Sequence, residues 1–256
     1  CAGTIDDQLQ RLLRMLWIWQ RMVVGLVESQ LSLSSNSPSF EILNRLPTKA
    51  VVMFDESTVR KEFDSRGCGV QASRNVQHNE RFIPGAKVVA VGPRIEYLEY
   101  PFQQCVTTIT GQHIAKILLH LEQVHGAGIC HGDIRLANMV FAEQAEHSML
   151  SDFDMSGTVE QQRYPAGYAL NLPDTKRHNE ASAGATLAFE HDRFSLASSF
   201  RLLKLEASDE QSAEQWRGLC DRIESREELV SIARDARDFG AILTWPNEFI
   251  TGGWER

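Results

Sequence analysis

HGDIRLANMVF, at residues 131–141, and LSDFDMSG, at residues 150–157, are the stretches that decide how this chain is interpreted. In the first, an aspartate stands two residues after a histidine, an asparagine follows five residues later, and an apolar run ends the stretch. In the second, Asp152 follows a short apolar run. Pairing of the two runs as neighbouring strands would bring Asn138 and Asp152 to the same edge, so the pattern predicts a polar site there.

The residue types at this edge suit the transfer of a phosphoryl group, which needs an orienting base, metal ligands and cations more than covalent help. Asp133 can accept the proton of an acceptor hydroxyl, and Arg135 is placed to reach the transferred phosphate. Asn138 and Asp152 offer the hard oxygen ligands that Mg²⁺ prefers. The alternative is that an aspartate caps a local turn and two other residues are ordinary polar loop residues. That alternative does not require the spacing seen here.

The two stretches resemble motifs of the protein kinase superfamily. HGDIRLAN resembles the catalytic loop H-R-D-L-x-x-x-N, and SDFDMSG resembles the D-F-G segment. The resemblance covers most of residues 46–205. It implies an α+β, two-lobed protein kinase-like fold with a small β-rich N-lobe and a truncated helical C-lobe, and ATP and Mg²⁺ as cofactors. It makes Asp133 and Arg135 catalytic, and Asn138 and Asp152 metal ligands.

Other parts of the chain extend this resemblance. A helix at residues 111–125 stands where the family has the helix before its catalytic loop. Asp192, with FSLASSF after it, looks like the buried helix whose aspartate holds that loop. IEYLEYPF resembles the hinge, where the backbone of Glu99, Tyr100 and Pro101 would hold adenine.

A narrower resemblance surrounds the motifs. GICHGDIRLAN, RYPAGY and EHDRFSLA are similar to divergent kinase-like domains of fungal and oomycete proteins, including effectors of the crinkler type. In that group the pairs YP, RH and HD recur across the activation segment, as Tyr164-Pro165, Arg177-His178 and His191-Asp192 do here. This resemblance leaves delivery into a host cell open as an alternative.

Three departures from the kinase pattern bear on activity. Gly132 replaces the arginine that receives an activation-loop phosphate. The sequence HGD is also found at this position in small-molecule phosphotransferases of the superfamily. Asp154 replaces a glycine and adds negative charge near the metal site, either as an extra magnesium ligand or, as we expect, facing solvent. There is no glycine between Pro38 and Lys61, so the glycine-rich phosphate loop is missing.

The lysine that would contact the α- and β-phosphates of the nucleotide is expected to be Lys61, with Lys49 and Arg60 as competitors. Val59, Lys61 and Phe63 share one face of a predicted strand, which would direct the lysine into the cleft.

In the kinase superfamily this lysine pairs with a glutamate on a helix. Gln71 stands at the matching position of this chain. A glutamine can accept a hydrogen bond from the ammonium group but does not neutralise it, and charge-assisted pairs are stronger. Glu80 is the alternative partner, but it lies close to Pro84, where a helix should already have ended.

The chain divides into three predicted regions. These are an N-terminal amphipathic helix and linker at 1–38, a nucleotide-binding N-lobe at 39–104 and a catalytic C-lobe at 105–256. KAVVMF, STVRKEF, AKVVAVG and RIEYLEY are typical of strands. The expected helices are 111–125, 194–205, 212–223 and 226–243. His113, His120 and His125 on the first of these are expected to be packed or solvated rather than metal ligands.

The most apolar run, residues 12–27, is interrupted by Arg14, Gln20 and Arg21, so no uncharged stretch reaches the roughly 18 residues of a membrane span. Apolar residues at helical spacing predict an amphipathic helix over 9–27. Either this helix packs on the domain, or its two tryptophans give it a surface that binds a partner, self-associates or lies on a membrane.

Composition narrows the remaining choices. A net charge of −8 over 256 residues excludes a sequence-independent grip on nucleic acid, which needs basic surface. Five scattered cysteines without a CxxC pair favour reduced thiols and an intracellular location.

Three functions stay open at this stage. The leading one is an ATP- and Mg²⁺-dependent phosphotransferase acting on protein Ser or Thr hydroxyls. The second is a catalytically degenerate module that binds partners, favoured by Gln71, Asp154 and the missing glycine loop. The third is a small-molecule kinase. The sequence does not name a protein substrate or partner.

Overall fold

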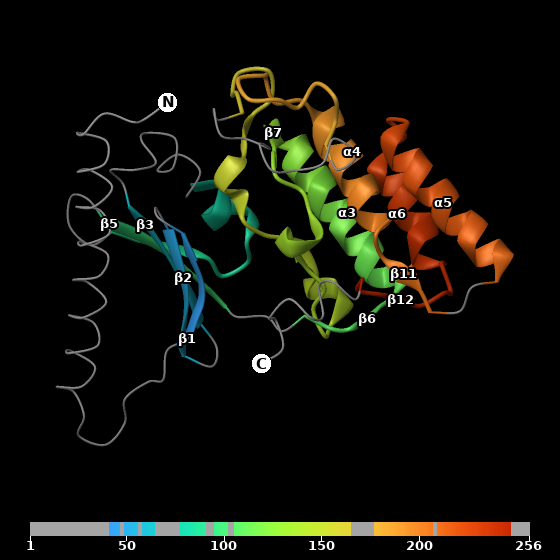
Figure 1. Ribbon diagram of the computed structural model, residues 1–256, viewed down its shortest axis with the longest axis horizontal. Coiled ribbons are helices and arrows are strands. Elements are labelled where there is room, and N and C mark those ends of the chain that lie inside the picture. Colours follow the sequence, from blue (N-terminus) through green and yellow to red (C-terminus); the bar gives the residue numbers. More distant parts are fainter. Residues whose placement is uncertain are drawn as a thin grey trace, which may run out of the picture. The chain divides into compact units, whose positions relative to one another are not determined.

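The computed structural model describes residues 41–46, 49–55, 58–64, 77–90, 95–101, 105–164, 177–206 and 209–246. The chain divides into two compact units, one of residues 1–70 with 87–102 and one of residues 71–86 with 103–256 (Figure 1). Segment 71–86 therefore belongs with the second unit. The predicted region boundaries after residues 38 and 104 stay predictions.

The first unit holds a five-stranded antiparallel sheet with the strand order β1-β2-β3-β5-β4. The strands are β1 Glu41–Leu46, β2 Lys49–Asp55, β3 Thr58–Asp64, β4 Lys87–Ala90 and β5 Ile95–Pro101. The four predicted strands are confirmed. β1 was not predicted, and its register with β2 shifts between Ile42 and Asn44, which breaks the alternation that marks a strand.

The register of this sheet separates Lys61 from its competitor Arg60. Lys61 lies opposite Leu98 of β5, and Val59 shares its face; these three side chains are 2%, 0% and 3% exposed. Arg60 points to the other face, where its Nε and Nη2 donate to Glu99 Oε1 at 3.0 and 2.6 Å. Lys61 is therefore the buried cation of the pair.

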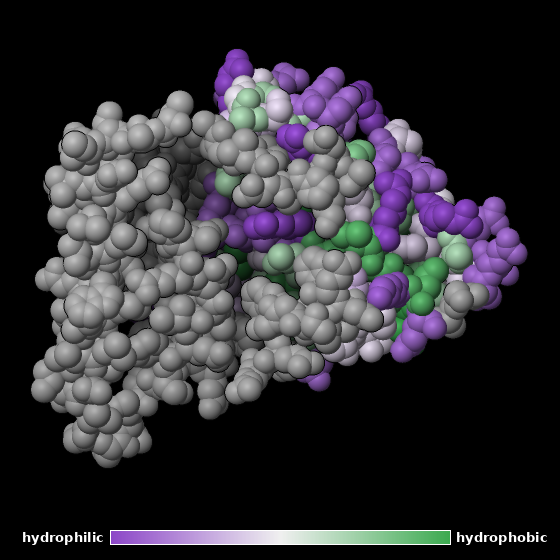
Figure 2. Space-filling view, in the orientation of Figure 1, coloured by the Kyte–Doolittle hydropathy of each residue, from purple (hydrophilic) through white to green (hydrophobic). Residues whose placement is uncertain are grey.

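The second unit is built on α3 Gly111–Gly126, which confirms the helix predicted at 111–125 and buries Ile114, Ile117, Leu118, Leu121 and Val124 along one stripe. Around it stand α4 Phe189–Phe200, α5 Glu210–Glu224 and α6 Leu229–Arg237 (Figure 1). A Cβ at Gly111 would lie 2.0 Å from the carbonyl oxygen of Ala236, so glycine lets α3 begin directly against α6. The outer edge of this unit is largely hydrophilic (Figure 2).

Two predicted helices differ in their bounds from the structure. α4 begins at Phe189 rather than residue 194 and ends at Phe200, and α6 ends at Arg237 rather than residue 243. The residues after them form strands β11 Lys204–Leu205 and β12 Leu243–Thr244, which join β6 Thr108–Ile109 in a three-stranded sheet. Pairs of two residues between distant segments leave no local pattern, so the sequence did not indicate this sheet.

The predicted N-terminal helix at 9–27 lies outside the described residues. Within the described part of the chain, no helix has both the length and the apolar character needed to cross a membrane.

The three histidines of α3 are hydrogen-bonded packing residues, as predicted. The ring of His120 donates from Nε2 to the carbonyl oxygen of Phe82 at 3.0 Å and accepts at Nδ1 from the amide of Leu150 at 2.8 Å. Both bonds are made by the neutral imidazole, and burial lowers the pKa of His120 to about 4. The ring thus joins α3 to the helical residues 77–82 and to β9 Met149–Leu150.

Acidification should destabilise the second unit through His120. The pKa is about 4 when folded and near 6.5 when unfolded, so the unfolded chain binds the proton more readily and stability is lost as the pH falls between these values. Between pH 7 and pH 5 the expected loss is about 2 kcal/mol. His120→Gln keeps a donor and an acceptor but does not titrate.

Urea unfolding at both pH values would check this, with the exposed His147 replaced in His147→Gln as the control. We expect the free energy of unfolding of His120→Gln to change less with pH than that of the other two proteins. Equal changes in all three would contradict this role of His120.

Candidate active site

Pairing of two short strands places the two sequence motifs together. β7 Ile129–Cys130 leads into the loop that begins at His131, and a 3₁₀ turn at Leu136–Asn138 leads into β8 Met139–Val140. β8 pairs with β9, and the amide of Ser151 donates to the carbonyl oxygen of Asn138 at 2.8 Å. The predicted pairing is confirmed, and Asn138 and Asp152 lie at the same end of this pair.

The loop is anchored by the carboxylate of Asp192, which is 1% exposed. It accepts from the backbone amides of His131 at 2.7 Å and Gly132 at 2.9 Å, and from the ring of His125 at 3.0 Å. Burial alone would raise the pKa of this carboxyl, but the His125 bond and charge, His131 and the Gly132 amide together hold it below its ordinary value. The structure therefore confirms that Asp192 ties down the loop.

His131 is a fully buried positioning residue. Its Nε2 donates to the carbonyl oxygen of Ser151 at 2.9 Å, and its Nδ1 accepts from the amide of Asp133 at 3.3 Å. Its ring packs on Phe153 with centroids 4.5 Å apart. The imidazole thus joins the loop to the residues on both sides of Asp152.

Asp133, Arg135 and Asn138 form one hydrogen-bonded group. The amide nitrogen of Asn138 donates to the carbonyl oxygen and to Oδ2 of Asp133, at 2.8 and 2.9 Å, and Arg135 Nη2 lies 3.2 Å from the same Oδ2. Among the described residues, nothing donates to Asp133 Oδ1 or to Asn138 Oδ1. One oxygen of each residue is therefore available within this part of the chain.

The pKa of Asp133 is raised above its ordinary value, first by burial and further by the negative charge of Asp152. Arg135, His131 and the bond from Asn138 oppose this shift without cancelling it. A cation bound near Asp152 would offset the negative charge that raises the pKa of Asp133.

The left-handed residue of the SDFD segment is Asp152, not Asp154, which stands where the D-F-G segment has glycine. Asp152 adopts the left-handed region, with φ 61° and ψ 63°, a conformation that aspartate tolerates better than most residues. Asp154 has no positive φ, so its side chain costs no backbone strain. Asp154 is partly buried and its Oδ1 is shielded from solvent, which corrects the expectation that it faces solvent.

The helical residues 77–82 hold this segment from the other side, a contact that the sequence did not indicate. The Oδ1 of Asn79, which is 1% exposed, accepts from the amide of Phe153 at 3.0 Å. His78 Nδ1 lies 2.8 Å from Ser156 Oγ, and Phe82 stacks on Phe153 with centroids 5.3 Å apart. The partners predicted in this region were Gln71 and Glu80, and Asn79 was not among them.

The other predicted site residues are in different parts of the chain. Lys61, Glu99, Tyr100 and Pro101 lie in β3 and β5 of the first unit. Gln71 lies outside the described residues. Glu80, its alternative, is exposed.

Gly132 has a structural reason that the motif alone does not reveal. Its φ is 79°, and a Cβ there would lie 2.6 Å from the carbonyl oxygen of Met155. The arginine of the usual motif would have to displace this backbone, so glycine here reflects close packing against the SDFD segment.

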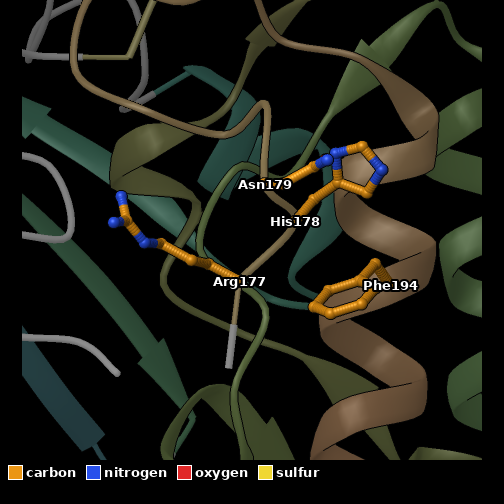
Figure 3. Close-up of a pocket in the computed structure, with 4 residues that line it drawn as sticks. All are labelled: Arg177, His178, Asn179 and Phe194. Atoms are coloured by element: carbon orange, nitrogen blue, oxygen red, sulfur yellow. The ribbon is translucent and has the colours of Figure 1, made fainter. Parts of the chain in front are cut away.

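A separate pocket of about 600 Å³ opens beside the start of α4 (Figure 3). Its described lining residues are Arg177, His178, Asn179 and Phe194. None of the predicted catalytic or metal-binding residues is among them.

Comparison with solved structures shows that the fold is kinase-like. The crystal structure of the BubR1 kinase domain matches with a TM-score of 0.51 and 13% sequence identity, over 80% of this chain and 81% of that chain. At this identity the likeness shows the fold alone. A scan against models of protein families and a search of curated proteins each found no match, so the narrower crinkler-type resemblance is unsupported.

Gly132→Ala should destabilise the second unit more than Gly128→Ala. Both glycines have left-handed backbones, with φ 79° and 74°, so alanine adds strain of about 1–2 kcal/mol at either position. Only at residue 132 does the new Cβ meet backbone, because nothing lies within 4 Å of the corresponding point at Gly128. We expect a further loss of about 1–3 kcal/mol in urea unfolding. Equal losses would show that the Met155 backbone yields freely.

Proposed function

We propose that the chain is an ATP- and Mg²⁺-dependent phosphotransferase with the two-lobed arrangement of protein kinases, acting on Ser or Thr hydroxyls of proteins. The observation that carries the proposal is the bonding of Asn138 to Asp133, which leaves one oxygen of each residue available beside Asp152. Such a group offers a base beside hard metal ligands.

Asp133 would take the proton of the acceptor hydroxyl. Its available Oδ1 supplies the acceptor, and its raised pKa brings its basicity nearer to the operating pH, where a general base works best. Arg135, whose side chain is 50% exposed, pairs with Asp133 and would move to the transferred phosphate when substrate is bound.

Asn138 and Asp152 would hold Mg²⁺, which supplies positive charge to the phosphate oxygens when it is bound. The donor set fits this ion, since it offers an amide oxygen and a carboxylate. The charge of Asp152 that raises the pKa of Asp133 would also be neutralised by the ion. Lys61 would contact the α- and β-phosphates, and the backbone of Glu99, Tyr100 and Pro101 would hold adenine.

A kinase-like module that binds partners without turnover is the second candidate. It is supported by Gln71 at the position of the acidic partner and by the absence of glycine between Pro38 and Lys61. The shielded negative charge of Asp154 next to the proposed metal site supports it further. Transfer of phosphate to small-molecule acceptors alone would identify a small-molecule kinase.

Asp133→Asn should abolish phosphoryl transfer while it leaves nucleotide binding nearly unchanged, because it removes the base and no metal ligand. Asp152→Asn should instead remove the extra thermal stabilisation that nucleotide gives with Mg²⁺ over chelator. Thermal shifts with ATP and transfer of labelled phosphate to a panel of protein and small-molecule acceptors measure the two effects.

Asp221→Asn, a change at an exposed carboxylate on α5, serves as the control for both variants. Wild-type transfer no faster than that of Asp133→Asn, combined with a normal shift by ATP, would favour the binding module. No shift by ATP under either condition would exclude nucleotide binding altogether.

The pH profile of transfer should depend on the charge of residue 135. Asp133 must be deprotonated to act as the base, so kcat/KM should fall as the pH drops through its pKa, at a pH above the ordinary aspartate value of about 3.9. Arg135→Leu removes a charge that lowers this pKa, so the acid limb should move to higher pH. Arg135→Lys should keep the limb near its wild-type position. If the acid limb of the profile lies at the same pH in all three proteins, Asp133 is not the group whose titration it reports.

A further inference from the structure

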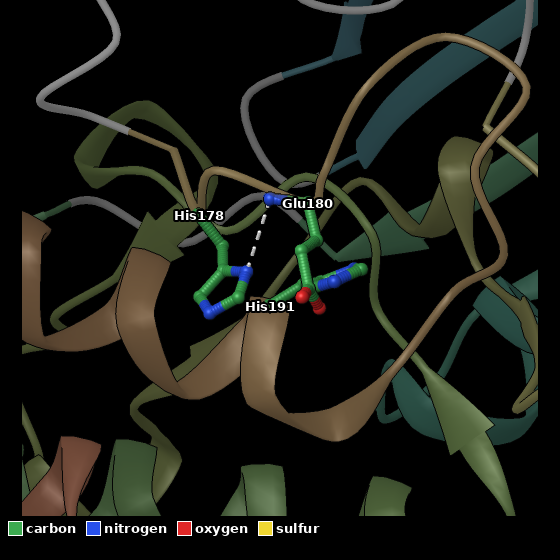
Figure 4. A group of neighbouring side chains, drawn as sticks. All are labelled: His178, Glu180 and His191. Atoms are coloured by element: carbon green, nitrogen blue, oxygen red, sulfur yellow. Dashed lines mark hydrogen bonds between the residues drawn. The ribbon is translucent and has the colours of Figure 1, made fainter.

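His178, Glu180 and His191 converge at a place that phosphoryl transfer does not use. One ligand atom from each residue lies within 4.8 Å of those of the other two. His178 and Glu180 come from the segment before α4, and His191 comes from the first turn of α4 (Figure 4). The two imidazole rings lie with their centroids 4.9 Å apart.

The orientation of His191 is set by a hydrogen bond on one side of its ring. The side chain is 4% exposed, and its Nδ1 lies 3.2 Å from the Tyr164 hydroxyl. When Nδ1 donates to this oxygen, Nε2 keeps its lone pair for a metal ion, an arrangement typical of histidine ligands.

The carboxylate of Glu180 completes the group. Glu180 is exposed, and its backbone amide donates to Nδ1 of His178 over a long 3.3 Å. The nearby Glu190 is engaged elsewhere, since Arg226 Nη2 lies 2.7 Å from its Oε1. Glu180 is therefore the carboxylate near the two rings that is able to turn toward an ion.

The three ligand atoms are slightly too far apart to bind one ion as they stand. Tetrahedral Zn²⁺ with nitrogen and oxygen ligands needs ligand atoms about 3.3 Å apart, so the group must close by about 1.5 Å at most. The partly buried His178 and the exposed Glu180 can provide this movement, while His191 stays in place.

We propose that His178, Glu180 and His191 bind a Zn²⁺ ion that fastens the segment before α4 to the first turn of that helix. Imidazole and carboxylate groups suit this ion, and water would occupy its fourth position. The pocket lined by His178 gives the ion a path from solvent. The site adjoins Asp192 in sequence, so the ion would also steady the helix turn that anchors the loop. The proposal does not depend on whether the chain transfers phosphate.

Zinc titration of the chelator-treated, full-length chain tests the proposal, with calorimetry and thermal unfolding as readouts. Zn²⁺ should raise the Tm of the wild type, as any ligand of the folded state does. Glu180→Gln and His178→Gln should each weaken binding by at least about ten-fold. The exposed residues Glu206 and His147 supply matched controls, and Glu206→Gln and His147→Gln should bind as the wild type does.

Cobalt distinguishes this site from cysteine sites elsewhere in the chain. Bound Co²⁺ should give the visible bands of a tetrahedral nitrogen and oxygen site without the intense near-ultraviolet band of a thiolate ligand. Three results would each overturn the proposal: no saturable effect of Zn²⁺ on the wild type, binding unchanged in both Glu180→Gln and His178→Gln, or a thiolate band at the first equivalent of Co²⁺.

Discussion

The carboxylate of Asp192 is the group on which the candidate active site depends. It is buried, and it accepts two successive backbone amides of the loop together with the ring of His125. Removal of one partner from such a buried charged group typically costs about 3–5 kcal/mol, because the remaining charge is left uncompensated. The amides of His131 and Gly132 thus have a fixed place relative to α4, and the positions of the following residues are built from them.

Histidines that form hydrogen bonds through both ring nitrogens connect the neighbouring segments. His131 connects the loop to Ser151, and His120 connects α3 to β9 and to Phe82. His113 uses its two nitrogens in the same way, between Thr110 and the carbonyl oxygen of Ala142. Each ring thus forms hydrogen bonds to two different segments. The segments around Asp152 are therefore held by directional bonds as well as by apolar packing.

Local patterns in the sequence predicted much of this arrangement. The alternating strands of the first unit, the apolar stripe of α3 and the pairing that brings Asn138 beside Asp152 all follow from short-range spacing. The place of Asp192 followed from the resemblance to kinases. The likeness to a solved kinase domain agrees with these parts at the level of the fold.

The remaining features depend on contacts between distant residues. Asn79 accepts a hydrogen bond from the amide of Phe153, and the backbone of Met155 leaves no room for a side chain at residue 132. The two residues of each pair are far apart in the sequence, so no local pattern reveals the contact. The bulge in β1 hides a strand by breaking its alternation. Asp154 was assigned to solvent because its neighbours in space were unknown. Such features are decided by packing, which single-residue preferences do not encode.

The small sheet of β6, β12 and β11 determines how the second unit would respond to mechanical force. Thr108 pairs with Thr244, and just outside this pair the indole of Trp245 donates to the carbonyl oxygen of Val106 at 2.7 Å. Because the strands are antiparallel, the chain enters and leaves this sheet at the same end. Tension between residues 105 and 246 would therefore break these bonds, together with those that join Cys105 and Val106 to Ala142 and Phe141, one after another rather than all at once. The helices between β6 and β12 would carry little of this load until the two strands had separated, so this sheet would open before the helices unfold.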